Sequence, residues 1–443
     1  MMASNGVVTT PGGPRRPVLN RTRTLPFPAD RRHPRRTTMA FSRPGTAEHG
    51  WAGIVTLGLL TITTYGSWFY GFGVLIGPIG DDMGWSTTTL GLTYGSAMVL
   101  SGLGAFVGGR MLDRFGGTGP FLLHAVAGGS LLLAATWADD AATFGLMYSI
   151  GAGVTGATGF YHVTTAAAAR LRPDQSDRAI AVLTVIGALC SPIYLPFTAW
   201  LVTAWHWRTA GRVLAVLSIA GALLATVVAH GGRSTTSGPS ANPLRTLRAA
   251  LDRREVRRML AAYVAAWIAY TSVLVYQVPI LTGAGLTLGT AGAIGGLRGF
   301  CQVFGRLGLT GLAERHGSGR LLRLAFTTSA LGIAFLVIGT IPAGIAFGVL
   351  AGVTIGASSP LQAIYARSQF DEGDLGLLMG LQGAAMGLAG GLGPLLGGVM
   401  RDASGTWTPT ILMAIASLAL GTWLLRPDDT TSISTVDDPV VAG

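Results

Sequence analysis

The sequence predicts an all-α membrane protein with twelve transmembrane helices in two six-helix bundles, and three observations lead to this fold class. Hydrophobic residues make up 49% of the chain and charged residues 12%, with a mean hydropathy of +0.51, whereas a soluble domain carries about 25% charged residues. Apolar stretches of membrane-spanning length recur between residues 51 and 426. Acidic residues fall only between these stretches or in the tails. A chain with this pattern is expected to lie in a membrane.

Each apolar stretch supplies the roughly 20 residues that a helix needs to cross about 30 Å of hydrocarbon. Because backbone polar groups find no water there, the spans are expected to be helices, and the alternating pattern of an outer-membrane barrel is absent. The expected spans are residues 52–78, 87–109, 119–137, 142–166, 179–203, 209–229, 259–282, 289–312, 321–341, 343–365, 375–399 and 408–425.

The arginine distribution predicts the orientation of the chain. If both termini are cytoplasmic, 26 of the 31 arginines lie on the cytoplasmic side, as the positive-inside rule requires. We therefore expect a multi-pass protein of the cytoplasmic or inner membrane. The expected units are a disordered Arg/Pro-rich tail (1–50), a first bundle (51–230), a cytoplasmic central loop (231–258), a second bundle (259–426) and a cytoplasmic tail (427–443).

The tail of residues 1–50 is expected to lie against anionic lipid headgroups, because it is basic and lacks the apolar pattern of a folded unit. A start at Met39 is the alternative.

Several function classes are excluded by residue types that the chain lacks. All 31 basic residues are arginine, so there is no Gly-Lys-Ser/Thr loop to hold nucleotide phosphates. The sequence contains no HExxH zinc motif and no GxSxG elbow, and its two cysteines lie in separate spans. We expect no enzyme activity, cofactor, metal site or nucleic-acid partner.

One basic residue, Arg298, falls at the centre of the eighth span. A charge at bilayer depth costs about 3 kcal/mol even on lenient insertion scales, and it marks a functional site by default. Gln302 and Arg306 follow at four-residue spacing, so the two guanidinium groups would lie on one helix face about 12 Å apart. Since no acidic residue lies in a span, the pattern favours capture of a carboxylate. As alternatives, Arg306 extends to the interface and Arg298 bonds helix carbonyls.

His162, late in the fourth span, is the proton-coupling candidate. Imidazole titrates near neutrality, and the spans offer no carboxylate that could carry a proton. A structural histidine with satisfied hydrogen bonds is the alternative.

A repeat links the two halves of the chain. Residues 109–116 (GRMLDRFG) close the second span of the first half, and residues 311–317 (GLAERHG) close the corresponding span of the second half. The pair resembles the signature loop of the major facilitator superfamily. The resemblance implies alternating access with a cytoplasmic latch, and the residues expected to gate it are Gly109, Asp113, Arg114, Gly116, Glu314 and Arg315.

Within that superfamily the second half resembles the monocarboxylate porter group and its bacterial relatives. The resemblance rests on residues 276–279 (YQVP), Gln302, and Gly305-Arg306. It departs from the family at two points, because Gln302 replaces an aspartate and Tyr70 lies near the position of a first-span lysine. The substrate-binding residues that the resemblance and the arginine pattern together predict are Arg298, Gln302, Arg306, Tyr70, Tyr276 and Gln277.

The leading hypothesis is therefore a monomeric secondary active transporter that moves a small organic anion, in the first place a monocarboxylate, by alternating access. Protons are a candidate second ligand, as in a symporter. The first alternative is proton-driven efflux of drugs or metabolites. A membrane sensor that no longer transports is the second, and it would need an output domain.

Overall fold

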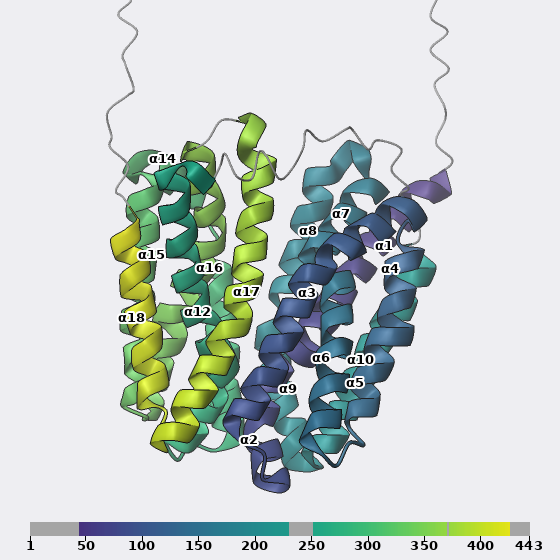
Figure 1. The fold of residues 1–443 in the computed structure, drawn as a ribbon. Coiled ribbons are helices and arrows are strands. Elements are labelled where there is room, and N and C mark those ends of the chain that lie inside the picture. Colours follow the sequence, from purple (N-terminus) through teal and green to yellow (C-terminus); the bar gives the residue numbers. More distant parts are fainter. Residues whose placement is uncertain (1–43, 230–250, 370–371, 426–443) are drawn as a thin grey trace, which may run out of the picture. The chain divides into compact units, whose positions relative to one another are not determined.

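The computed structural model describes residues 44–229, 251–369 and 372–425, and these are helical apart from short connections (Figure 1). The all-helical fold class is confirmed. Most of the predicted tails, 1–50 and 427–443, and of the central loop 231–258 lies outside the described residues. The boundaries of the two bundles stay a prediction.

The helices before the central loop, here called the N-terminal helices, extend from Pro44 to Val228. They are α1 (Pro44–Thr64), η1 (Tyr65–Tyr70), α2 (Gly71–Met83), α3 (Thr87–Phe115), α4 (Thr118–Leu123), η2 (His124–Gly129), α5 (Ser130–Ala135), α6 (Ala141–Gly159), α7 (Tyr161–Leu171), η3 (Pro173–Gln175), α8 (Ser176–Ala188), α9 (Cys190–Ala204) and α10 (Trp207–Val228).

The helices after the loop, the C-terminal helices, follow the same all-helical pattern. They are α12 (Arg254–Gly283), α13 (Leu288–Gly305), α14 (Leu309–His316), α15 (Ser318–Ala334), η4 (Phe335–Val337), α16 (Ile341–Gln369), α17 (Glu372–Ser404) and α18 (Thr408–Leu424). We call the face where α1 begins and α18 ends the near face, and the opposite face, where α3 begins and α17 ends, the far face (Figure 1).

Eight helical segments among the described residues are long and apolar enough to cross a membrane, and Thr408–Leu424 is a shorter apolar helix. Three expected spans are not single helices, which corrects the prediction. Span 179–203 is divided at Leu189, between α8 and α9. Span 142–166 breaks at Phe160, whose backbone is extended between α6 and α7. Span 289–312 breaks after α13, where Gly308 takes a φ of +68° before α14 begins. Hydropathy does not mark the break at Phe160, because both of its sides are apolar.

Local sequence explains where the long helices begin and end. Ser86 caps α3 by accepting a hydrogen bond from the Thr89 amide, and Asp140 caps α6 in the same way through the Thr143 amide. These side chains satisfy amides that the helix itself leaves without partners. At the other end of α3, Gly116 has a φ of +65°, a conformation that glycine adopts without strain.

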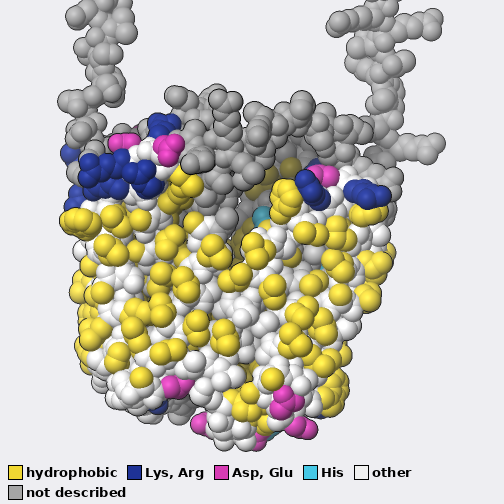
Figure 2. All heavy atoms as spheres, viewed as in Figure 1, with side chains coloured by type: hydrophobic (Ala, Val, Ile, Leu, Met, Phe, Trp, Pro, Cys, Tyr) yellow, Lys and Arg dark blue, Asp and Glu magenta, His cyan; other side chains and the backbone are white. Residues whose placement is uncertain are grey.

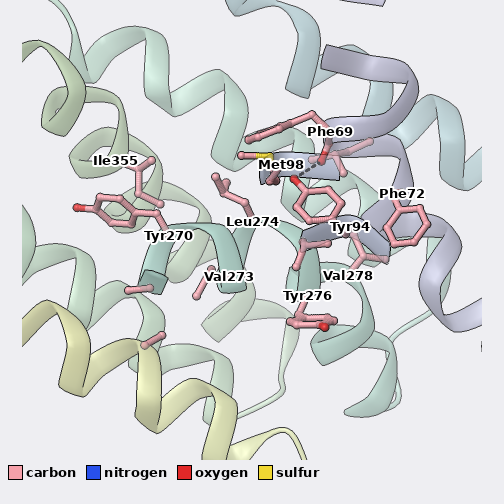
Figure 3. Close-up of a cluster of buried hydrophobic side chains, with 14 of the residues drawn as sticks. Phe69, Phe72, Tyr94, Met98, Tyr270, Val273, Leu274, Tyr276, Val278 and Ile355 are labelled. Carbon is pink, nitrogen blue, oxygen red and sulfur yellow. Dashed lines mark hydrogen bonds between the residues drawn. The ribbon is translucent and has the colours of Figure 1, made fainter. Parts of the chain in front are cut away.

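The N-terminal and C-terminal helices share one apolar core. Figure 3 shows Phe69, Phe72 and Tyr94 of the N-terminal helices beside Leu274 and Val278 of α12. The Tyr94 hydroxyl donates to the Phe69 carbonyl at 3.1 Å. The N-terminal and C-terminal helices approach each other closely only because glycine is present. A Cβ at Gly73 of α2 would lie 2.5 Å from the Val275 carbonyl oxygen of α12. The small residue lets the two backbones approach each other.

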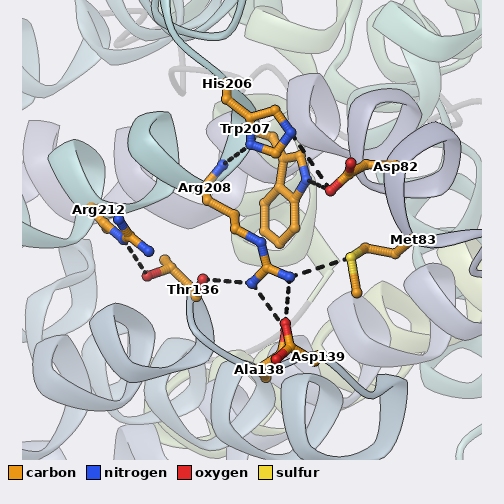
Figure 4. A network of polar contacts seen from close by, with 9 residues as sticks. All are labelled: Asp82, Met83, Thr136, Ala138, Asp139, His206, Trp207, Arg208 and Arg212. Atoms are coloured by element: carbon orange, nitrogen blue, oxygen red, sulfur yellow. Dashed lines mark hydrogen bonds and ion pairs between the residues drawn. The ribbon is translucent and has the colours of Figure 1, made fainter.

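At the far face, polar contacts fix the ends of α2, α5 and α10 (Figure 4). The Trp207 indole donates to Asp82 at 2.8 Å. The His206 Nε2 lies 3.6 Å from the same carboxylate. His206 starts α10 with a φ of 149°, which is unusual for a residue with a side chain.

Arg208 is the centre of this arrangement. Its guanidinium donates to the carbonyls of Thr136 and Ala138 at 2.8 and 3.1 Å, and to Asp139 at 2.8 Å. It also contacts the Met83 sulfur at 3.3 Å. One side chain therefore ties the start of α10 to the ends of α2 and α5.

We expect Arg208→Ala to lower the free energy of unfolding by about 2 kcal/mol, because several acceptors lose a charged donor at once. Thermal unfolding in detergent measures the loss. Arg212→Ala is the matched control, since Arg212 donates one hydrogen bond here, to Thr136, at 3.2 Å. Equal losses in the two variants would contradict the role given to Arg208.

Candidate functional site

Glycines on one face of α13 bring this helix against α9. A Cβ at Gly292 would lie 2.8 Å from the Ala199 Cβ, one at Gly296 would lie 3.2 Å from the Pro192 carbonyl oxygen, and one at Gly299 would collide with Ser191. The sequence therefore lets α13 lie directly on a neighbour from the other group of helices. Arg298 is placed at the end of this contact.

Arg298 is fully buried, with an exposed fraction of 0%. Its Nε donates to the Gln277 side-chain oxygen at 2.8 Å, and its Nη2 donates to the Ser191 hydroxyl at 2.8 Å. The guanidinium carbon lies 5.7 Å from the centre of the Tyr70 ring, within the range of a cation–π contact. The third nitrogen, Nη1, is buried without a hydrogen-bond partner.

These contacts show which predicted residues the structure brings together. Arg298, Gln277 and Tyr70 form one cluster, and Ser191 joins it. The alternative in which Arg298 bonds helix carbonyls is not what the structure shows, because its partners are side chains. A buried charge requires hydrogen bonds, and the donors of Nη1 have none among the described residues.

Tyr70 reaches this cluster from η1, a π-helical turn between α1 and α2. Such turns insert one extra residue into a helix and often occur at functional sites. Gly66 permits the turn to lie against Tyr194, because a Cβ there would overlap the tyrosine ring. The same turn carries Tyr65, which stacks on Phe160 with ring centres 4.0 Å apart.

Arg306 lies at the end of α13 and not inside it, which corrects the predicted eighth span. It follows the last helical residue, Gly305, and its side chain is exposed. Arg306 is close enough to the hydroxyls of Tyr161 and Tyr65 to interact with them electrostatically. Arg298 and Arg306 thus both face aromatic residues of the N-terminal helices.

The remaining predicted substrate residues lie elsewhere. Gln302 is half-buried, and its backbone packs against Gly356 of α16. The Tyr276 hydroxyl donates to the Pro394 carbonyl at 2.6 Å, and its ring lies 5.0 Å from that of Trp407. Tyr276 therefore joins α12 to α17, and the structure does not place it in the Arg298 cluster.

The two membrane histidines differ in their surroundings. His162 is the second residue of α7; its side chain is exposed and its Nε2 donates to the Ala157 carbonyl at 3.2 Å. His124 is fully buried, with Nε2 2.9 Å from the Ser218 hydroxyl and Nδ1 3.3 Å from that of Thr158. An exposed imidazole can exchange protons with water, and His124 is satisfied by its neighbours.

The predicted gating segments are only partly loops, which is a second correction. α3 continues to Phe115, so Gly109, Asp113 and Arg114 lie on its last turns and only Gly116 ends it. Asp113 forms an ion pair with Arg170 of α7. Arg114 lies over the Phe115 ring at 5.1 Å. The described contact of Asp113 therefore joins two N-terminal helices.

The second gating segment has a different form from the first. Glu314 and Arg315 are exposed on α14, a short helix separated from α13. The first repeat segment thus continues the helix of its span, whereas the second lies on a separate short helix after its span has ended.

Sequence reasoning missed Ser191 and did not connect the aromatic side chains of Tyr161 and Tyr65 with Arg306. A serine in a span carries little signal, because it is inexpensive to bury when it bonds its own backbone. The neighbouring Pro192, in the first turn of α9, was the one available hint. Among the described residues no group of histidine, cysteine and carboxylate side chains is arranged to hold a metal ion.

The surface between the N-terminal and C-terminal helices is hollowed toward the near face (Figure 2). On the far side of Arg298 the two groups of helices meet through glycines, as described for α9 and α13. Arg298 thus lies where the close contact between α9 and α13 ends.

The sequence matches the Major Facilitator Superfamily over residues 57–297 and 259–438. No curated protein matches it. Among solved structures, the nucleoside transporter NupG is similar with a TM-score of 0.69 at 14% identity, covering 84% of this chain and 97% of that one.

Two further solved structures show the same fold. A bacterial homologue of the human lysosomal transporter Spinster, solved in an inward-facing and unoccupied conformation, gives a TM-score of 0.67 at 13% identity, over 86% of this chain and 97% of that one. A D-xylose-proton symporter gives 0.66 at 13% identity, over 86% and 98%.

If the Asp113–Arg170 pair favours one access state, Asp113→Asn and Arg170→Gln should shift that balance in the same direction. The shift is measured as the accessibility, from each side of the membrane, of cysteines introduced at cavity positions. The double variant should add little, because each change removes the same contact. The free energy of unfolding should change by less than about 1 kcal/mol, since the pair is partly exposed. Glu314→Gln is the control on the separate helix α14, and labelling identical to the parent's in both pair variants would exclude the latch.

Proposed function

This chain belongs to the major facilitator superfamily and is a multi-pass secondary transporter of a small molecule, and we propose that its substrate is a small organic anion, in the first place a monocarboxylate. The observation that carries the proposal is the buried Arg298. Among the described residues it forms no ion pair, and Nη1 has no hydrogen-bond partner. A carboxylate would supply both the missing charge and the missing acceptor.

The surroundings of Arg298 support an anion over a cation. Its hydrogen-bond partners, Gln277 and Ser191, are neutral, and no Asp or Glu occurs among the buried side chains of the described residues. A cationic drug would meet positive charge without a compensating carboxylate. Efflux of cations is therefore the weaker alternative. Arg306, exposed beside Tyr161, offers a second positive group on the route from the near face.

The contacts of Arg298 also suggest how binding acts on access. Gln277 belongs to the C-terminal helices, whereas Ser191 and Tyr70 belong to the N-terminal helices. An incoming carboxylate competes with these partners for the guanidinium. Binding then changes the contact between the two groups of helices, and a ligand shifts a conformational balance only through such differences.

Proton coupling is proposed for His162. Its side chain is exposed, so that it can take up a proton from water, and an anion bound nearby would raise its proton affinity. We further propose that the near face is cytoplasmic, which places both termini on the cytoplasmic side of the cell membrane.

We expect Arg298→Ala to abolish uptake of a radiolabelled carboxylate into proteoliposomes, because the binding charge is lost. Arg298→Lys should retain a small fraction of the activity, since an ammonium group cannot reproduce the planar fork. Arg212→Ala, which removes an arginine at the far face, is the control and should transport as the parent does. Parental uptake by Arg298→Ala would place the anion site elsewhere.

A His162→Gln variant should keep anion exchange but lose accumulation driven by an inward proton gradient, because glutamine cannot titrate. Uptake is measured in vesicles with and without a pH jump, and the fully buried His124 provides a comparison through His124→Gln. Continued accumulation by His162→Gln would show that another group carries the proton. If the parent itself shows none, the protein is a facilitator or exchanger.

A further inference from the structure

Asp402, in the last turn of α17, makes a contact that joins the two groups of helices at the far face. The Thr87 amide donates to one carboxylate oxygen at 3.1 Å, and the Thr88 amide donates to the other at 2.6 Å. Thr87 and Thr88 are the first two residues of α3. The carboxylate thus caps a helix that lies more than 300 residues earlier in the chain.

This cap complements the one that α3 already has. Ser86 accepts from the Thr89 amide at 3.1 Å, so three successive free amides at the start of the helix have acceptors. The helix supplies partners for none of the three. A negative charge is also favoured at a helix N-terminus because of the helix dipole. Ser86 already accepts from the Thr89 amide, so the amides of Thr87 and Thr88 require an acceptor from outside α3. Asp402 supplies that acceptor.

On the near-face side of this contact, α3 and α17 meet closely through glycine residues. A Cβ at Gly398 would lie 2.6 Å from the Thr87 carbonyl oxygen, and one at Gly91 would lie 2.5 Å from that of Pro394. A Cβ at Gly95 would collide with the Gly391 carbonyl. Such contacts consist of van der Waals packing, which either helix can replace with contacts to lipid or water when the two separate. The carboxylate contact is different, since its hydrogen bonds to the Thr87 and Thr88 amides are lost when α17 moves away.

The charge of Asp402 matches this role. Partial burial raises the pKa of its carboxyl group, but the hydrogen bonds from Thr88 and Thr87 outweigh this effect, so that the pKa lies below its ordinary value. The neighbouring cation, Arg401, lies over the Trp407 ring at 5.4 Å. The ionised form is the form that binds α3.

We propose that Asp402 is a gating residue of transport, whose carboxylate holds α17 on α3 and keeps the far face closed. Opening that face requires α3 and α17 to part, and parting leaves two amides and a carboxylate without their partners. The bond is therefore present in one access state and absent in the other. The role follows from alternating access in this superfamily and does not depend on which substrate Arg298 binds.

The experiment measures how often the far face opens. Met98 of α3 is 7% exposed, and its methyl group lies against Gly390 of α17, so Met98→Cys reports the separation of the two helices. The buried Cys190 and Cys301 are first replaced by alanine. A membrane-impermeant thiol reagent, confined to the far side of sealed vesicles, then labels the cysteine at a rate that follows the open population.

We expect Asp402→Ala to raise the far-side labelling rate about fivefold, the change that loss of one helix cap produces. Asp402→Asn keeps one acceptor oxygen and should raise the rate by a smaller factor. Thr87→Pro tests the same contact from α3. Proline is tolerated at the first position of a helix, and the preceding Ser86 already has the extended backbone that proline requires. This variant removes one donor and should raise the rate by a smaller factor, without adding to the effect of Asp402→Ala.

Asp139→Asn is the matched control, because Asp139 is an exposed carboxylate of the far face whose partner, Arg208, belongs to the same group of helices. It should leave the labelling rate unchanged. Gel filtration and thermal unfolding confirm that each variant is folded. Far-side labelling at the parental rate in folded Asp402→Ala and Thr87→Pro would overturn the proposal, and so would an equal increase in Asp139→Asn.

Discussion

Contact between helix backbones through glycine is the constraint on which the rest of this structure depends. Helices in a membrane gain little by exchanging lipid for one another unless they pack closely. α3 meets α17 at Gly91 and Gly95, and α13 meets α9 at Gly292 and Gly299. A side chain at any of these positions would require a shift of the neighbouring helix or side chain. Two polar residues lie where these contacts end. Arg298 lies at the end of the α9–α13 contact inside the protein, and Asp402 lies at the end of the α3–α17 contact at the far face.

Arg298 is costly to bury, and its surroundings reduce that cost only in part. Two neutral side chains and one aromatic ring stabilise the guanidinium, whereas full compensation of a buried charge requires an opposite charge and complete hydrogen bonding. Arg298 therefore keeps a charge that its neighbours compensate only in part. Its partners come from both groups of helices, so that under the proposed function an anion compensating this charge would act on both sides of the interface.

The sequence indicated the fold and the most important charge, but not the details that complete the site. Composition and the spacing of apolar stretches are enough for an all-helical membrane protein, because the bilayer permits few alternatives. Arg298 stood out since a charge in a span is rare. Ser191 did not, since serine is common in spans. Asp402 was missed because the eleventh span was expected to end at residue 399, whereas α17 continues to Ser404.

Breaks inside apolar segments were also beyond sequence reasoning. Nothing in the hydropathy separates Phe160 from its neighbours, and its extended backbone depends on the aromatic rings around it, including Tyr65 and Trp68. The end of α13 before Arg306 is followed by Gly308 and its positive φ, a local feature of the backbone that hydropathy does not register.

The unbroken course of α3 has a mechanical consequence. Its 29 residues make a rod about 43 Å long, with the Asp402 contact at one end and Asp113 at the other. A rod of this kind acts as a lever: when its far end swings away from α17, its near end must swing in the opposite direction about the glycines in between. The corresponding segment of the C-terminal helices is jointed at Gly308 and cannot transmit such a motion. Of the two segments that carry the repeat, α3 is therefore the one in which a movement at one membrane surface is delivered to the other.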